Sequence, residues 1–134
     1  MDREGIDRFF TERFPAAVAL GFEVTAIAPD GASIALATRD DHLRPGGTVS
    51  GPTLMTLADT AMYVALLARH GLDAATGLTS SLEVHFLARA MPGRVTADCR
   101  ILKSGRRLSV GVVDLRGDDG TLCAHATVTY ALPG

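Results

Sequence analysis

Residues 42–69 read HLRPGGTVSGPTLMTLADTAMYVALLAR, a loop rich in glycine and proline that leads into a long apolar run. The PGG motif at residues 45–47 opposes regular structure, because proline fixes φ and glycine admits positive φ. A helix is predicted to begin after Ser50, since this capping hydroxyl stands two residues before a proline of the first helical turn. The leucines and alanines that follow recur at helical spacing, and Asp59 is the only formal charge before Arg69. The stretch therefore predicts one apolar helix with a single carboxylate in its middle.

The composition indicates one packed domain that contacts neither nucleic acid nor a membrane. Of the 134 residues, 47% are hydrophobic and 21% are charged, which suits a single apolar core. The net charge is −2, so the chain has no basic field for nucleic acid. The charged opening MDREGIDRFF lacks the apolar core of a signal peptide, and the Asp59 helix is too short for a membrane span. We therefore expect a cytoplasmic protein.

The cysteines and histidines give no sign of a metal or a disulfide framework. Cys99 and Cys123 both fall in strand-like runs, so we expect two reduced thiols in the core. The four histidines show neither catalytic-triad nor metal-ligand spacing. No metal site is predicted.

The first half of the chain predicts two strands between a short helix and the long one. Aromatic residues mostly three or four positions apart indicate an amphipathic helix that ends near Pro15. Residues 22–28 and 32–38 read as strands around the turn sequence PDG. After the long helix, Gly71 can take the left-handed capping conformation.

From Gly77 onward the apolar period changes to two, which predicts four strands separated by the turn sequences AMPG, KSGR and DDG. We expect the helix-facing residues to be Ser80, Leu82, Val84 and Phe86; Val95, Ala97, Cys99 and Ile101; Leu108, Val110 and Val112; and Leu122, Ala124, Ala126, Val128 and Tyr130. The opposite face of the first of these strands is expected to carry Thr79, Ser81, Glu83 and His85. The whole order predicts an α+β fold, with one helix on a curved antiparallel sheet.

These features resemble the hotdog-fold acyl-CoA thioesterases. The resemblance is carried by the two early strands, the loop LxPGGTVxG at residues 43–51, the helix segment TLADTA at residues 56–61 and the four closing strands. It spans residues 20–132 and is greatest for the phenylacetyl-CoA thioesterase-like group.

The resemblance implies a single hotdog domain over residues 1–134, with a helical segment at 1–19 and the hotdog core at 20–134. In this fold a long central helix is wrapped by a curved antiparallel sheet of about six strands. The resemblance also implies an active site shared between two subunits. We therefore expect a homodimer or a dimer of dimers, which would cover the edge and the open face of the sheet.

In the family, a loop of the form Asn-x-x-Gly-x-x-His-Gly-Gly leads into the central helix. The resemblance implies that the Gly51 N–H binds the thioester carbonyl oxygen and that Asp59 attacks the thioester or activates water. Thr79 matches a residue that assists this water. The family's Asn falls on Arg44, its His falls on Ser50, and its last glycine is a proline, which has no N–H. The Gly51 N–H donor is thus retained, whereas the residues at the Asn, His and last Gly positions of the family loop have changed.

Three residues near this loop are candidate substrate contacts, each with a second interpretation. Ser50 can bind substrate, but it also suits a helix cap. Arg44 can be a solvated loop charge, a partner for Asp59 or a contact to an acidic acyl group. His42 lies on the same loop and could reach the site.

A basic cluster at a predicted hairpin is a candidate CoA-binding site. Lys103, Arg106 and Arg107 surround the turn between two late strands. A charged turn is often only solvated, but the phosphates of CoA need cationic partners, and a hairpin beside the groove is a plausible anchor in this family.

The sequence thus favours a thioesterase that hydrolyses a small or medium acyl-CoA, aryl groups included, with no cofactor beyond the CoA of the substrate. Two alternatives remain open. One is an acyl-CoA-binding protein without catalysis, in which Ser50 and Arg44 mark lost chemistry. The other is a hotdog enoyl-CoA hydratase or dehydratase, for which only His42 could supply the basic residue.

Overall fold

The apolar run after the glycine-rich loop forms the central helix α3 (Gly51–His70). Ser50 caps this helix, because its Oγ accepts a hydrogen bond from the Thr53 N–H at 3.2 Å. The helix ends at Gly71, whose φ of 62° lies in the region that favours glycine. Ten of its 20 residues are buried, so α3 is a core element. Neither α3 nor any other helix within residues 1–133 is long and apolar enough to cross a membrane.

The computed structural model describes residues 1–133, and Gly134, the last residue of the expected domain, lies outside the described residues. The elements before α3 are α1 (Arg3–Arg13), α2 (Pro15–Val18), β1 (Phe22–Ala28), β2 (Gly31–Ala37) and the 3₁₀ turn η1 (Asp40–His42). The elements after it are the 3₁₀ turn η2 (Gly71–Ala74), β3 (Leu78–Phe86), β4 (Arg94–Ser104), β5 (Leu108–Arg116) and β6 (Leu122–Ala131).

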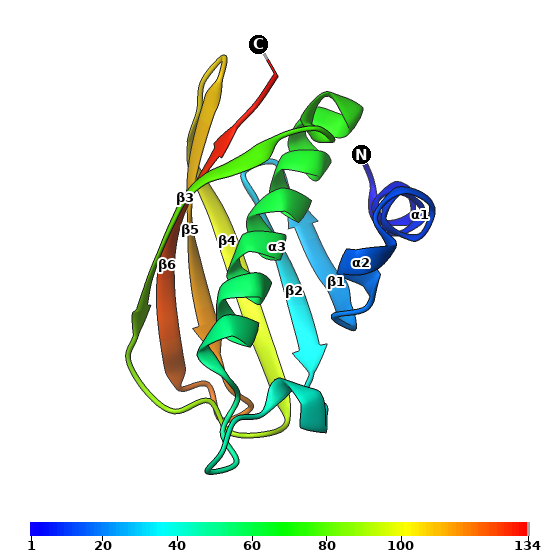
Figure 1. Ribbon diagram of the computed structural model, residues 1–134. Coiled ribbons are helices and arrows are strands. Elements are labelled where there is room, and N and C mark those ends of the chain that lie inside the picture. The colour runs from blue at the N-terminus through cyan, green and yellow to red at the C-terminus, as the bar shows by residue number, and fades with distance from the viewer. Residues whose placement is uncertain (134) are drawn as a thin grey trace.

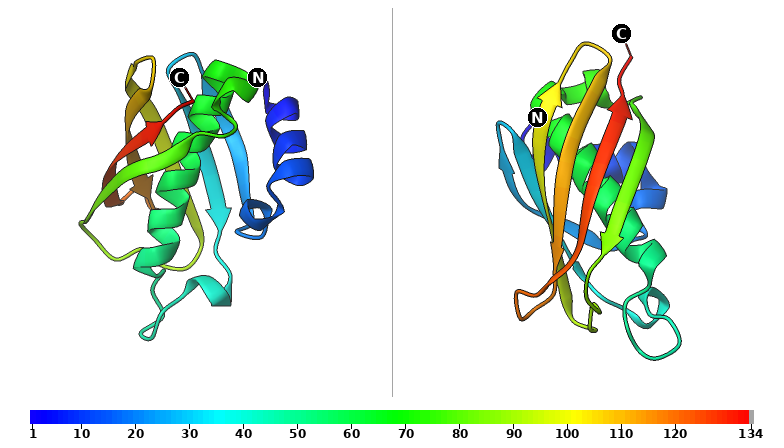
Figure 2. Two further views of the ribbon diagram at one scale, coloured as in Figure 1. Left: turned by 45° about the horizontal axis from the view of Figure 1, so that its top comes forward. Right: turned by 90° about the vertical axis from the view of Figure 1, so that its left-hand side faces the viewer.

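The six strands form one antiparallel sheet in the order β1-β2-β4-β5-β6-β3. The sheet curves around α3, which lies along its concave face (Figures 1 and 2). This arrangement confirms the predicted α+β hotdog fold. Because β3 is the last strand of the order, one of its edges has no neighbour within the described chain.

Helix α1 packs against α3 and β1, and α2 follows it before β1 begins (Figure 1). Asp2 caps α1 by accepting a hydrogen bond from the Gly5 N–H at 2.8 Å. Phe9 and Phe10 are buried and lie 6.1 and 5.8 Å from the Tyr63 ring of α3, centroid to centroid. The predicted amphipathic helix is therefore confirmed, and its aromatic face reaches the middle of α3.

A β-bulge reverses the predicted faces of β5. The extra residue is Leu102, which places Ile101 opposite Gly111 instead of Val112. The buried residues of β5 are consequently Ser109, Gly111, Val113 and Leu115. The prediction that Leu108, Val110 and Val112 face the helix is wrong. Both faces of β5 carry apolar residues, so the alternating pattern alone could not indicate which face contacts α3.

A second bulge turns Thr79 toward α3. Thr79 pairs with Tyr130 and Ser81 pairs with Thr129, which leaves Ser80 as the extra residue of β3. Thr79 and Tyr130 therefore point to the same face of the sheet. The predicted alternation, with Ser80 inward and Thr79 outward, is wrong at this end of β3, because a bulge shifts the facing of every residue before it.

Candidate active site

The carboxylate of Asp59 receives two hydrogen bonds on the same oxygen. Asp59 lies half-buried in the third turn of α3. Thr79 Oγ1 donates to its Oδ1 at 2.7 Å, and the Tyr130 hydroxyl donates to the same Oδ1 at 2.9 Å. Within residues 1–133, Oδ2 has no hydrogen-bond partner. One oxygen is thus anchored to the sheet while the other keeps its lone pairs free.

Tyr130, one of these two donors, is buried and stacked. Its side chain is only 4% exposed, and its ring stacks on Tyr63 at 5.9 Å with an interplanar angle of 17°. Burial, followed by the negative charge of Asp59, raises the pKa of Tyr130 well above its ordinary value. The phenol therefore keeps its proton at any physiological pH and acts as a hydrogen-bond donor. The Tyr63 hydroxyl has another partner, the carbonyl oxygen of Ala75 at 2.6 Å.

Two cavities meet at Asp59. One, of about 410 Å³, opens toward η2 and β3 and includes Arg13 and Leu78 in its lining. The other, of about 200 Å³, lies toward α1 and α2. Both are lined by Phe14, Asp59, Tyr63 and Tyr130. The carboxylate therefore stands at the edge of an aromatic recess that the N-terminal helices help to build.

Gly51 lies at a separate cleft of about 430 Å³, lined also by Arg44, Leu54, Phe86 and Arg89. The Thr53 N–H is bonded to the Ser50 side chain, and the Leu54 N–H is bonded to the Ser50 carbonyl. The residue between, Pro52, has no N–H. The Gly51 N–H has no acceptor within residues 1–133, and it lies at the positive end of the helix dipole.

Gly51 and Asp59 of one chain are too far apart to act on one carbonyl group. They are separated by eight residues of a continuous helix, which corresponds to about 12 Å along its axis. A reacting carbonyl needs both its attacking group and its oxyanion donor within about 3–3.5 Å. Each chain therefore contains two separate parts of a site, the Gly51 N–H at the start of α3 and the Asp59 carboxylate in its third turn.

The other predicted residues lie at several places. Ser50 caps α3, and the Arg44 Nε approaches the Pro45 carbonyl oxygen at 3.4 Å. Arg44 has no carboxylate partner in the described chain, so it does not pair with Asp59. His42 is buried, and its Nδ1 accepts a hydrogen bond from a backbone N–H of the same loop at 2.9 Å. It lines neither the Asp59 cavities nor the Gly51 cleft.

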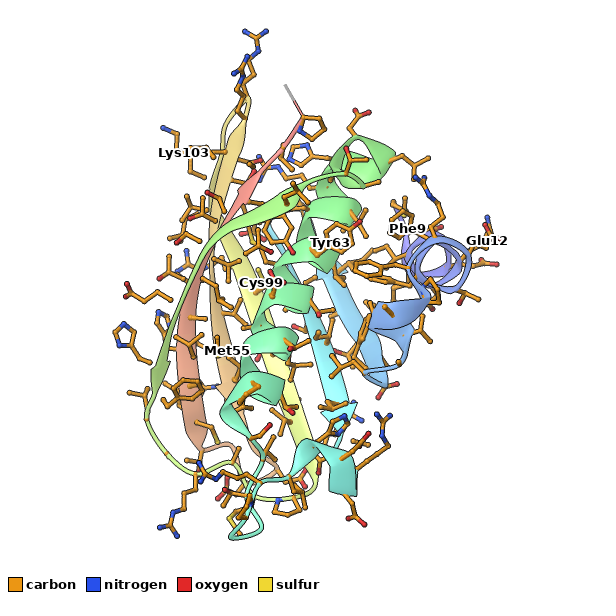
Figure 3. The ribbon with its side chains drawn as sticks, viewed as in Figure 1. Phe9, Glu12, Met55, Tyr63, Cys99 and Lys103 are labelled. Carbon is orange, nitrogen blue, oxygen red and sulfur yellow. The ribbon has the colours of Figure 1, made fainter. Side chains whose placement is uncertain are left out.

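The basic cluster of Lys103, Arg106 and Arg107 is exposed on the β4–β5 hairpin. This hairpin lies near the end of α3 (Figure 3, where Lys103 is labelled), whereas Gly51 lies at its start. The cluster and the Gly51 cleft are therefore at opposite ends of the molecule. Residues 1–133 hold no group of three or more His, Cys, Asp or Glu arranged to bind a metal ion.

Sequence reasoning missed Tyr130 as a site residue. Its position at core spacing on the last strand made it look like an ordinary apolar contact. The one available signal was its chemistry, because a buried tyrosine hydroxyl needs a hydrogen-bond partner and Asp59 is the only carboxylate of α3.

Comparisons with known proteins agree with this architecture. The family profile of the thioesterase superfamily matches residues 46–124, a segment that contains Gly51, Asp59 and Thr79. No curated protein matches the chain.

Several solved structures share the fold over most of the chain. A candidate thioesterase from Silicibacter sp. TM1040 is 33% identical, with a TM-score of 0.88 over 100% of this chain and 93% of its own. A mutant of the phenylacetic acid degradation protein PaaI from Thermus thermophilus is 30% identical, with a TM-score of 0.77 over 87% of this chain and 97% of its own. The thioesterase HI1161 from Haemophilus influenzae is 21% identical, with a TM-score of 0.87 over 100% of this chain and 92% of its own, and supports the fold alone. The family match covers more than half of the chain, and the resemblance inferred from the residues is confirmed: this chain belongs to the thioesterase superfamily and has its hotdog fold.

Proposed function

We propose that the chain is an acyl-CoA thioesterase. It hydrolyses the CoA thioesters of small or medium acyl groups, aryl groups included, to the free acid and CoA. The observation that carries the proposal is the Asp59 carboxylate, with one oxygen anchored and the other free at an aromatic recess. Membership of the thioesterase superfamily supports a thioester as the substrate. The size of the recess and its Phe and Tyr lining favour a compact or aromatic acyl group.

In the proposed reaction Asp59 acts as general base. Its Oδ2 accepts a proton from water while the water oxygen attacks the thioester carbonyl carbon. The carbonyl electrons move to the oxygen, and the Gly51 N–H stabilises this oxyanion. When the intermediate collapses, the C–S bond breaks and the CoA sulfur takes the proton back from Asp59. One water is consumed, and the products are an acid and a thiol. In the nucleophilic route Oδ2 bonds to the carbonyl carbon, the C–S bond breaks and CoA leaves as the thiolate. Water then opens the resulting anhydride, which frees the acid and restores the Asp59 carboxylate, and one proton of that water ends on the CoA sulfur; this route uses the same two groups.

The two groups would come from different subunits of a homodimer. Thr79, which binds Asp59, lies near the start of β3, and the Phe86 ring, at its end, lies beside Gly51. Antiparallel pairing of two β3 edges about a two-fold axis would bring each Gly51 near the partner subunit's Asp59. The free edge of β3 and the exposed side chains of Leu78 and Phe86 support this dimer.

The CoA phosphates are proposed to bind Lys103, Arg106 and Arg107, and Arg44 to lie beside the substrate at the Gly51 cleft. The antiparallel dimer supports both roles, because it would place the hairpin of one subunit at the Gly51 end of its partner. Ser50 is proposed to act mainly as the cap that fixes the first helical turn. His42 is buried, is hydrogen-bonded through Nδ1 and lines neither the Asp59 cavities nor the Gly51 cleft, so it is not placed to serve as the basic residue of the hydratase alternative.

The experiment that tests this function is a CoA-release screen over aryl, short and long acyl thioesters, with Asp59→Ala as control. We expect turnover of at least one aryl or medium acyl-CoA by the wild-type chain and none above background by Asp59→Ala. Binding of acyl-CoA without release of CoA would instead support the non-catalytic alternative, and addition of water to an enoyl-CoA would support the hydratase.

A further inference from the structure

The two hydrogen bonds on Asp59 make its carboxylate oxygens unequal. A free carboxylate can rotate about χ2 and exchange its two oxygens, since this torsion has a broad, two-fold profile. Here Thr79 Oγ1 and the Tyr130 hydroxyl both donate to Oδ1, at 2.7 and 2.9 Å. Rotation would break both bonds at once. The orientation of the carboxylate is therefore fixed by the sheet, although Asp59 itself belongs to the helix.

The two donors come from neighbouring strands of the sheet. The Ser80 bulge directs Thr79 inward, where strict alternation would direct it outward. Tyr130 is its cross-strand partner, so the two hydroxyls lie side by side on neighbouring strands. Tyr130 is 4% exposed and its ring is stacked on Tyr63, which restricts its rotamers. Of the two, Tyr130 is the buried and rigid donor, while Thr79 is exposed.

The Tyr130 hydroxyl also reaches the backbone carbonyl oxygen of Asp59, at 3.3 Å. One phenol thus contacts both the side chain and the main chain of the same residue. The phenol has a single hydrogen, so the 2.9 Å bond to Oδ1 is the main one and the 3.3 Å contact is the longer branch of a three-centre hydrogen bond. Tyr130 thereby ties the turn of α3 that carries Asp59 to the last strand of the sheet.

We propose that Tyr130 is a positioning residue that, with Thr79, holds Asp59 through Oδ1 and so makes Oδ2 the reacting oxygen. The proposal rests on the proposed thioesterase function. In general-base catalysis Oδ2 takes the proton of the attacking water, and in nucleophilic catalysis Oδ2 forms the bond to the carbonyl carbon. In both routes the anchored Oδ1 keeps its two hydrogen bonds and exchanges no proton with the substrate.

The test is Tyr130→Phe, which keeps the stacked ring and removes only the hydroxyl. We expect kcat to fall about tenfold or more with KM unchanged. A general base that points in the wrong direction slows the chemical step but does not alter the ground-state binding of the substrate. Thr38→Val is the control for general loss of a part-buried hydroxyl. Thr38 Oγ1 makes hydrogen bonds to the Gly93 carbonyl and N–H at 2.9 and 2.7 Å, just beyond the paired ends of β2 and β4, and lines neither Asp59 cavity. This control should lose thermal stability and keep kcat.

A crystal structure of each variant gives a second readout that does not depend on activity. In Tyr130→Phe the Asp59 carboxylate should rotate or show two orientations, whereas in Tyr63→Phe, which keeps both donors to Oδ1, it should stay as it is. Tyr130→Phe with wild-type kcat, or with an unmoved carboxylate, would overturn the proposal. If the wild-type chain released CoA from no thioester, the proposed function would fail, and the carboxylate orientation would still show whether Tyr130 positions Asp59.

Discussion

Replacing Asp59 by Asn separates the chemistry of the carboxylate from its place in the packing. The Asn side-chain oxygen can still accept the hydrogen bonds of Thr79 and Tyr130, so the anchored side of the group survives. The free side becomes an amide NH₂, which cannot accept a proton. Asp59→Asn therefore removes the proposed reactive oxygen, Oδ2, and keeps the hydrogen bonds that Thr79 and Tyr130 donate to the other side-chain oxygen.

Asp59→Asn is expected to lower kcat strongly and to change the free energy of unfolding only slightly. Loss of a general base lowers kcat by about 10²–10⁴, or about 3–5 kcal/mol in the activation barrier. For stability, two charge-assisted hydrogen bonds of about 1.5–3 kcal/mol become neutral bonds of about 1 kcal/mol. Removal of a half-buried charge offsets this loss. We expect the free energy of unfolding to change by no more than about 1 kcal/mol, a shift in melting temperature of only a few degrees.

The assay is CoA release at saturating acyl-CoA, paired with thermal melting of the same preparations. Asp59→Ala is the matched variant: it should lose as much rate but also leave the buried Tyr130 hydroxyl without its side-chain acceptor, at a further cost of about 1–3 kcal/mol. The two variants should thus agree in kcat and differ in melting temperature. A stable Asp59→Asn protein with wild-type kcat would refute the proposed mechanism.

Four further predictions concern the rest of the chain. Neutralising two of Lys103, Arg106 and Arg107 should raise KM for acyl-CoA with little change in kcat, and an unchanged KM would show that the hairpin charges are only solvated. Light scattering at micromolar concentration should give at least twice the 14.0 kDa of one chain, and a monomer would remove the shared site. Burial raises the pKa of Cys99 to about 12 from 9.0, so at pH 8 its thiol should react with a thiol reagent far more slowly in the native protein than in denaturant. Because the folded pKa is the higher one, the stabilising contribution of Cys99 is complete below about pH 9 and should be lost as the pH rises toward 12, which pH-dependent unfolding would measure.

Most of the fold could be predicted because its signals are local. The cap at Ser50, the glycine at residue 71 and the apolar run between them define α3 without help from the tertiary structure. Turn sequences separate most of the strands, so the number of strands and their positions along the chain could be predicted. The faces of β5 and the start of β3 could not be predicted, since the bulges at Leu102 and Ser80 are properties of strand pairing and leave no mark in a single strand.

The candidate site, like the fold, could be predicted only in part. Asp59 could be predicted because a carboxylate in an apolar helix is costly unless it has a partner or a role. Thr79 was a site candidate only through the family resemblance, since the strand pattern assigned it to the wrong face, and Tyr130, which lies 71 residues away along the chain, was not predicted. Contacts of that range depend on the register of the whole sheet.

The Ser80 bulge means that the direction of Thr79 depends on how the edge strand is paired as well as on its residues. Deleting Ser80 would remove the bulge, and Thr79 would then stand directly before Ser81, still opposite Tyr130 and on its face by regular alternation. A relative with one residue fewer at this point of the strand would reach the same arrangement of the two hydroxyls without a bulge. In comparisons among relatives, a one-residue gap here is therefore compatible with an unchanged site, whereas an ungapped strand that lost the bulge would turn its threonine outward.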